Sequence, residues 1–191
     1  MEKRDRVNIA VAKAVAELLA KTAEELGMTQ YALANQILSV GLELVRMGYS
    51  PSQIREVALF YKIMTELESL PVPGRLMDRM IVEVASVDAE AVYRAWCDAG
   101  KMLAAYIKAV FGDLEKAVEL APYLAKVIPA KRFDVKAQGG NFQLDAVGVG
   151  YSIESVQATA RAVQCLLEEV GYEVKEVVTA PGVLRVSAAK K

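Results

Sequence analysis

The period of the hydrophobic pattern changes near residue 131, and this change constrains the fold more than the composition does. Between Leu76 and Val84, apolar residues recur at three- and four-residue spacing, which is typical of a helix with one buried face. From Phe133 to Ala137 they alternate with polar residues, which is typical of a strand with one buried face. The sequence therefore predicts an α+β protein.

The last third of the chain predicts two hairpins with a helix between them. Gly139-Gly140 suits a tight turn between strands at 133–138 and 142–149. A stretch from 153 to 170 has an apolar stripe at helical spacing and is followed by Gly171, where a C-cap glycine belongs. Strands at 174–178 and 183–188 complete the pattern. We expect a ββαββ two-layer unit, a small sheet with a helix on one face.

Helix start signals divide the chain before residue 131. Gly48-Tyr49-Ser50-Pro51 ends one helix and starts another, with Ser50 as N-cap and Gln53 completing a capping box. Asp88 and Asp113 have the position of N-caps for two later helices. Together with the break at Pro71-Val72-Pro73-Gly74, these signals predict three domains. They are an N-terminal module at 1–49, a helical region at 50–130, and the C-terminal unit at 131–191, which oligomerises or senses an effector.

The N-terminal module has a pattern that a single copy cannot satisfy. Residues 6–11 alternate as a short strand, and two amphipathic helices follow, the first ending at Gly27 and the second capped by Thr29. The strand has no partner nearby in sequence, and an isolated edge strand is unstable. We therefore expect a two-fold dimer, in which the strand pairs with its copy and the helices close over the ribbon.

This arrangement resembles the ribbon-helix-helix DNA-binding proteins, the Arc/MetJ/CopG superfamily. The resemblance covers about residues 4–47 and rests on the alternating strand Arg6–Val11, the Ala23–Gly27 end of the first helix, and the Met28-Thr29 start of the second. In that family, the paired strands lie in the major groove and three outward side chains read base edges. The resemblance implies a DNA-binding transcriptional regulator that acts on double-stranded DNA as a homodimer or higher oligomer.

The resemblance also implies which residues contact DNA. Arg6 can bond guanine and Asn8 adenine in bidentate fashion, whereas Ala10 offers only a methyl contact. Lys3 and Arg4 would contact phosphate, and the first turn of the second helix would hold another phosphate. That turn contains Thr29, Gln30 and Tyr31. The alternative is a non-enzymatic assembly protein that uses the ribbon for dimerisation only, with Arg6 and Asn8 solvated.

Other features exclude whole classes of function. The chain contains no histidine, which removes histidine-based catalysis and imidazole metal ligation, and its net charge is −1. No constellation of nucleophile, base or metal ligands is evident, so we expect neither an enzyme nor a cofactor nor a metal. No apolar run approaches the ~20 residues of a membrane span. The first residues contain no apolar signal-peptide core, and we expect a cytoplasmic protein without a membrane partner.

Three further groups of residues have a structural and a functional interpretation. Gly148–Ser152 suits either a phosphate loop or, better, a strand exit with Ser152 as helix cap. Cys97 and Cys165 are too few and too far apart for a zinc site or a disulfide scaffold, so we expect buried free thiols. Methionine and aromatic residues of the middle helices could line an effector pocket, although a core role is favoured. These residues are Met64, Met77, Met80, Tyr93, Trp96, Met102 and Tyr106.

Overall fold

The computed structural model describes residues 7–119, 121, 130–148 and 152–191 of the chain. These residues form two compact units, Met1–Val57 and Ala58–Lys191. The protein has the predicted α+β composition, with helices in both units and a four-stranded antiparallel sheet in the second.

Two helices and the start of a third make up the described part of the Met1–Val57 unit. They are α1 (Lys13–Glu25), α2 (Gln30–Arg46) and the first turns of α3 (Pro51–Glu66). The hydroxyl of Thr29 accepts the N–H of Ala32 at 3.1 Å and caps α2. Ser50 and Gln53 form the predicted capping box, since the Ser50 N–H donates to the Gln53 Oε1 at 2.8 Å and the Gln53 N–H donates to the Ser50 Oγ at 3.3 Å.

The prediction of an N-terminal ribbon is wrong. Residues 7–12 form neither strand nor helix, and from Lys13 to Glu66 the chain forms helices joined by short turns. Alternation of Val7, Ile9 and Val11 marks a strand only where a second strand supplies the ladder of hydrogen bonds. No described residue of this unit supplies one, so the ribbon-helix-helix dimer module is not the fold that the structure has.

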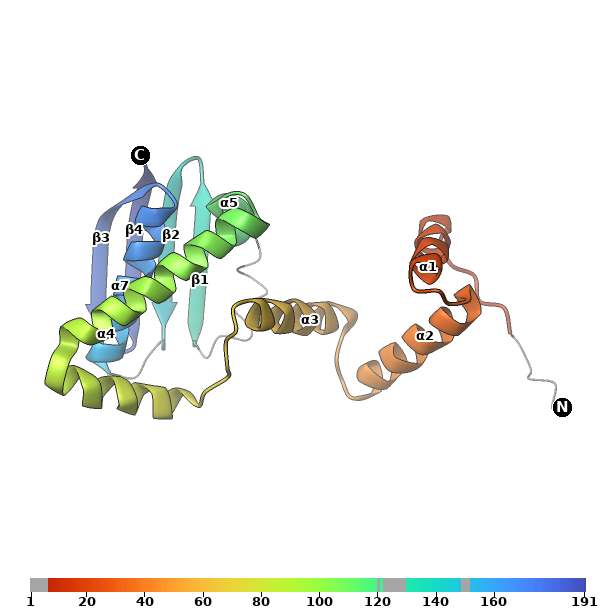
Figure 1. Ribbon diagram of the computed structural model, residues 1–191, viewed down its shortest axis with the longest axis horizontal. Coiled ribbons are helices and arrows are strands. Elements are labelled where there is room, and N and C mark those ends of the chain that lie inside the picture. The colour runs from red at the N-terminus through yellow and green to blue at the C-terminus, as the bar shows by residue number, and fades with distance from the viewer. Residues whose placement is uncertain (1–6, 120, 122–129, 149–151) are drawn as a thin grey trace. The chain divides into compact units, whose positions relative to one another are not determined.

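The Ala58–Lys191 unit is a helical layer on one face of a sheet (Figure 1). Its sheet has the order β1-β2-β4-β3, with every neighbouring pair antiparallel. Besides the end of α3, its elements are α4 (Gly74–Val110), α5 (Leu114–Val118), β1 (Arg132–Gln138), β2 (Asn141–Val147), α7 (Ile153–Glu169), β3 (Tyr172–Ala180) and β4 (Val183–Lys190). The two hairpins, with α7 between them, occupy the positions that the sequence pattern predicts.

Sequence signals at the turns and caps of this unit explain its local geometry. Gly139 and Gly140 both have positive φ, at 58° and 77°, as a two-residue hairpin turn of this kind requires. α4 is two helical arms joined at Asp88, whose backbone leaves the helical region and whose carboxylate accepts the Ala91 N–H at 2.9 Å. Asp113 caps α5 in the same way, with its carboxylate 2.8 Å from the Lys116 N–H. Asp88 and Asp113 are therefore the helix caps that the sequence predicts.

Alternate residues of the two central strands point into the core. Phe142, Leu144 and Ala146 of β2 and Leu184, Val186 and Ala188 of β4 are buried. They pack with buried side chains of the helical layer that include Ala104, Ile107, Val156 and Leu167. A second, smaller cluster joins both arms of α4 to α7 through Ile81, Val92 and Ala158, with Met77, Tyr93 and Trp96 against it. Met77, Tyr93 and Trp96 thus pack in the core, which is the role that the sequence favoured over the lining of an effector pocket.

The helices α4 and α7 approach each other very closely. A Cβ atom on Gly100 would lie 2.1 Å from the carbonyl oxygen of Ala162, so the position has room for glycine alone. One turn away, Cys97 and Cys165 form a disulfide with their Cα atoms 5.3 Å apart. The expectation of free thiols is therefore wrong. The two cysteines are 68 positions apart in the sequence, and this separation does not determine their distance in space once two helices pack side by side.

Gly100→Ala is expected to lower the free energy of unfolding of the full chain by about 1–3 kcal/mol, because a methyl group there must displace backbone. Gly41→Ala in α2 is the control, since a Cβ at that helical position meets nothing within 4 Å. Alanine there is expected to leave stability unchanged or raise it by about 0.5–1 kcal/mol. Urea unfolding followed by circular dichroism measures both, and equal effects at the two positions would contradict the close approach.

The Cys97→Ala/Cys165→Ala double variant is expected to lose about 2–4 kcal/mol of unfolding free energy, because an unfolded chain without the disulfide has more conformational entropy than one that is cross-linked. Wild-type protein treated with reductant is expected to lose a similar amount, whereas the double variant is expected to be insensitive to reductant. Alkylation of the denatured wild type, read by mass spectrometry, provides the chemical check. Two modified thiols before reduction would show that the bond is absent.

Candidate functional site

The residues at the start of the chain that sequence analysis assigned to DNA lie partly outside the described structure. Lys3, Arg4 and Arg6 belong to residues 1–6, which are not described. Asn8 and Ala10 lie in the segment 7–12 and are exposed. They are not on a strand, so the structure does not place them in the arrangement from which the base-reading role was inferred.

The second group of predicted DNA contacts lies together at the start of α2. Thr29 is the N-cap, and Gln30 and Tyr31 are the first two helical residues. The Thr29 hydroxyl accepts the N–H of Ala32. The positive end of a helix dipole lies at this end of α2, where it favours an anion such as phosphate.

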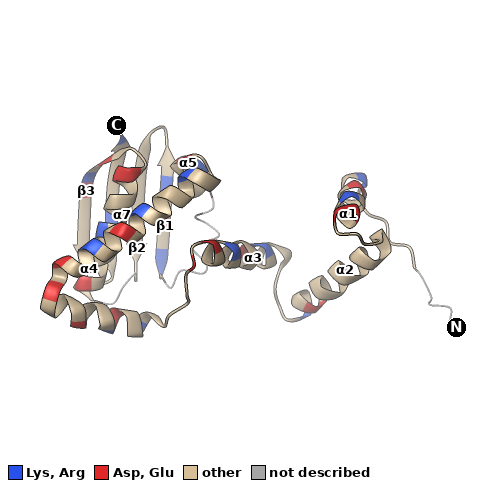
Figure 2. Ribbon diagram, viewed as in Figure 1, with Lys and Arg blue, Asp and Glu red and all other residues tan. Residues whose placement is uncertain are grey.

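Charge is evenly divided over the described part of the N-terminal unit (Figure 2). Lys13 and Lys21 form surface ion pairs with Glu17 and Glu25 along α1, at 3.7 and 3.8 Å. The basic residues from 7 to 57 are Lys13, Lys21, Arg46 and Arg55, and the acidic residues are Glu17, Glu24, Glu25, Glu43 and Glu56. The described surface of this unit is therefore not a basic patch.

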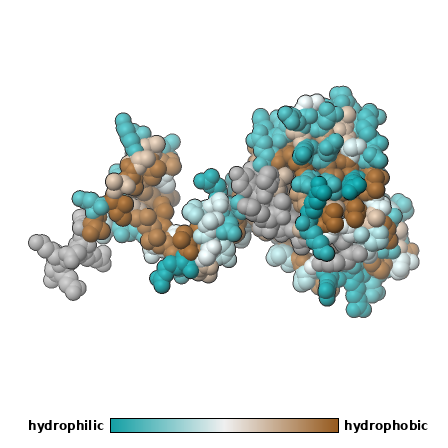
Figure 3. All heavy atoms as spheres, turned by 180° about the vertical axis from the view of Figure 1, so that it is seen from behind, coloured by the Kyte–Doolittle hydropathy of each residue, from teal (hydrophilic) through white to brown (hydrophobic). Residues whose placement is uncertain are grey.

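Apolar side chains dominate the surface of the same unit (Figure 3). Val7 is 85% exposed and Ile9 66%, whereas Ala23 and Leu33 are the buried apolar residues among those described. We call the exposed set the N-terminal apolar surface. Its members are Val7, Ile9, Val11, Val15, Leu18, Leu26, Ile37, Leu38, Val40, Leu42, Val45 and Met47. A folded monomer rarely exposes so many large apolar side chains, and such surfaces mark interaction sites.

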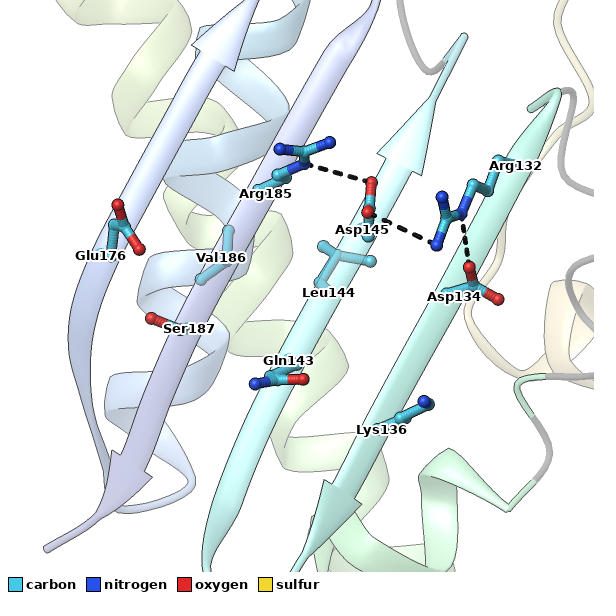
Figure 4. Close-up of a pocket in the computed structure, with 10 residues that line it drawn as sticks. All are labelled: Arg132, Asp134, Lys136, Gln143, Leu144, Asp145, Glu176, Arg185, Val186 and Ser187. Atoms are coloured by element: carbon cyan, nitrogen blue, oxygen red, sulfur yellow. Dashed lines mark hydrogen bonds and ion pairs between the residues drawn. The ribbon is translucent and has the colours of Figure 1, made fainter.

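The outer face of the sheet carries a polar groove in the Ala58–Lys191 unit (Figure 4). At one end of it, four charged side chains form a continuous network. Arg132 Nε lies 2.6 Å from Asp134 Oδ2, and Arg132 Nη2 lies 3.7 Å from Asp145 Oδ2. Arg185 Nε lies 3.5 Å from the second oxygen of Asp145. The hydrogen bond to Asp134 and the two carboxylate charges raise the pKa of Arg132 above its ordinary value.

Asp145 is the least solvated member of this network. Its side chain is 27% exposed, and its Oδ1 is buried without a hydrogen bond, because the contact with Arg185 is an ion pair whose geometry is not that of a hydrogen bond. Asp134 and Asp145 face each other directly across β1 and β2. Like charges in such a pair repel, and Arg132, which contacts both, offsets that repulsion.

The other end of the groove presents a row of polar side chains across all four strands. Lys136 pairs with Gln143, Gln143 with Ser187, and Ser187 with Glu176 in the strand register. The groove has a volume of about 260 Å³ and is lined by three basic and three acidic side chains (Arg132, Lys136 and Arg185 against Asp134, Asp145 and Glu176). This balance suits a polar, overall neutral ligand better than a polyanion such as nucleic acid.

Ser152 is the helix cap of α7 and not part of a described phosphate loop. Its hydroxyl accepts the Ser155 N–H at 3.1 Å and donates to Asp78 at 2.7 Å. The Ser155 hydroxyl also donates to Asp78, at 2.6 Å. Asp78 lies on the first arm of α4, and its role could not be found from the sequence, because 74 residues separate it from Ser152. Residues 149–151 of the glycine segment lie outside the described structure.

The described residues contain no group of three or more metal-ligating side chains that could hold an ion. Within the described ranges, the helices are too short or too polar to cross a membrane. Comparison of the chain with protein-family models, with curated proteins and with solved structures finds no match. The function must therefore be argued from the residues themselves.

Proposed function

We propose that this protein is a DNA-binding transcriptional regulator that acts as a dimer or higher oligomer through its N-terminal unit. The observation that carries the proposal is the N-terminal apolar surface, which a second copy of the chain would cover. Burial of each large apolar side chain contributes roughly 1.5–3 kcal/mol when it is complete. Burial of about a dozen such side chains would supply enough free energy to offset the entropic cost of association.

The DNA contacts of this proposal rest on the basic start of the chain and on α2. Lys3, Arg4 and Arg6 precede the exposed Asn8, and two copies of the chain double these groups. The N-terminal end of α2 adds the positive end of its helix dipole, which would attract a phosphate. Because residues 7–57 contribute no net positive charge, we expect binding to depend on these few contacts and to be weak for a single copy.

The alternative is a non-enzymatic assembly protein in which the N-terminal unit only self-associates. The even division of charge over the described N-terminal surface favours it, since DNA-binding surfaces are generally basic. Both functions require self-association, and only the first requires DNA. Two experiments separate them.

Ile37→Lys is expected to weaken self-association of the full chain at least 100-fold, because it would bury an unpaired charge at the contact between copies. Gln36→Lys is the matched control. It adds the same side chain at the neighbouring position of α2, and both positions are exposed in the single chain, so neither substitution disturbs the fold of one copy. Sedimentation equilibrium measures the dissociation constants. A wild type that stays monomeric at high concentration, or two variants that behave alike, would contradict the proposal.

Arg6→Ala or Asn8→Ala is expected to cost about 1–3 kcal/mol on a selected DNA site and to reduce sequence preference. Lys3→Ala or Arg4→Ala is expected to weaken binding to all duplexes. Each lost contact is also expected to reduce, by about one, the slope of the logarithm of the binding constant against the logarithm of the salt concentration. Fluorescence anisotropy with selected and random duplexes over a salt series measures both effects. Lys101→Ala, on an exposed position of α4, is the control. A wild type that associates but binds no duplex would favour the assembly protein.

A further inference from the structure

An apolar cavity of about 240 Å³ lies within the Ala58–Lys191 unit, between the helical layer and the inner face of the sheet. Helices α3, α4, α5 and α7 and strands β1, β2 and β4 all contribute to its wall. Representative lining residues are Ile63, Phe111, Ala117, Phe133 and Val163. The cavity is partly open to solvent, and the atoms that its wall exposes are apolar, so an apolar ligand would remove this surface from water.

The two polar side chains in the wall are already bonded elsewhere. The Thr159 hydroxyl donates to the Ser155 carbonyl at 2.8 Å, within α7. The Tyr106 hydroxyl donates to the Glu66 carboxylate. Burial and the interaction with Glu66 raise the pKa of Tyr106 to about 12, so this hydroxyl stays protonated and bonded to Glu66 at neutral pH. Among the described residues, the wall therefore offers no spare side-chain donor, and its polar acceptors are the hydroxyl oxygens of Tyr106 and Thr159.

The size of the cavity limits what it can hold. An apolar cavity of about 150 Å³ accommodates benzene and stays free of water. By that scale, the volume of about 240 Å³ accommodates roughly ten carbon-sized atoms. Aromatic side chains at Tyr106, Phe111, Phe133 and Phe142 surround it, and flat or cyclic hydrocarbon groups pack well against such rings.

We propose that this cavity is a binding site for a small apolar molecule, an aromatic or alicyclic compound of about ten carbon atoms without a buried hydrogen-bonding group. This site goes beyond the proposed DNA-binding function and does not depend on it. Ile63 of α3 is part of the wall, and Glu66 of the same helix bonds Tyr106 beside it. A bound molecule would therefore contact the end of the helix that begins in the N-terminal unit and ends in this one.

The test uses the full chain with methyl-labelled valine, leucine and isoleucine, and benzene as the probe. Benzene is expected to shift the methyl signals of Ile63, Val135 and Val163, which line the cavity, and to leave those of Ile81 and Val92 in the other core cluster unchanged. Phenol has the same ring and adds a hydroxyl whose hydrogen bonds to water the wall can replace only in part, through the acceptor lone pairs of Tyr106 or Thr159. It is expected to bind at least fivefold more weakly than benzene.

Ala117→Phe fills the cavity and is expected to abolish the benzene shifts, whereas Ala105→Phe adds the same ring at an exposed position of α4 and is expected to preserve them. If Ala117→Phe does not fold, the comparison of benzene with phenol on the wild type decides the question. Absence of shifts at the cavity methyls would overturn the site. Equal shifts in both clusters, or equal affinity for phenol, would overturn it as well.

Discussion

The close packing of α4 against α7 is the contact on which the larger unit depends. At Gly100 the two backbones leave no room for a methyl group, and the Cys97–Cys165 disulfide joins the same helices one turn away. The two helices form one layer, and the inward side chains of β2 and β4 are buried against it. The polar groove lies on the opposite face of the sheet, while the apolar cavity adjoins Tyr106 and Ile107 on the later part of α4. The apolar cavity therefore shares this helix pair with the core, whereas the sheet separates the polar groove from it.

The two units differ in how completely they bury their apolar residues. The Ala58–Lys191 unit has a continuous core between the sheet and the helices, and it satisfies the polar groups at its helix ends with Asp88, Asp113 and Ser152. The described part of the Met1–Val57 unit buries Ala23 and Leu33 and exposes most of its other large apolar residues. The first unit leaves that surface exposed to water, whereas the second has a core of its own. Both proposed functions include self-association of the first unit, which would cover the exposed surface.

The charges of the molecule argue against a large electrostatic interface with nucleic acid. Ion pairs neutralise most of the charge on α1, and the groove on the sheet balances three basic with three acidic groups. DNA binding by this protein would rest on a few contacts near the start of the chain and on the doubling that association brings. A molecule bound in the apolar cavity would touch Ile63 at the end of α3.

Local signals in the sequence determined the helix ends and turns, because a cap needs only residues within about three positions of one another. Thr29, Ser50, Asp88 and Asp113 act as predicted, and so does the Gly139-Gly140 turn. Alternation at residues 7–11 predicted a strand wrongly, because pairing depends on a partner that the pattern cannot supply. The tertiary structure alone decided the Cys97–Cys165 bond, the contact of Gly100 with Ala162, and the bond of Asp78 to Ser152. Each joins residues more than 60 positions apart, and only the path of the packed helices brings such residues together.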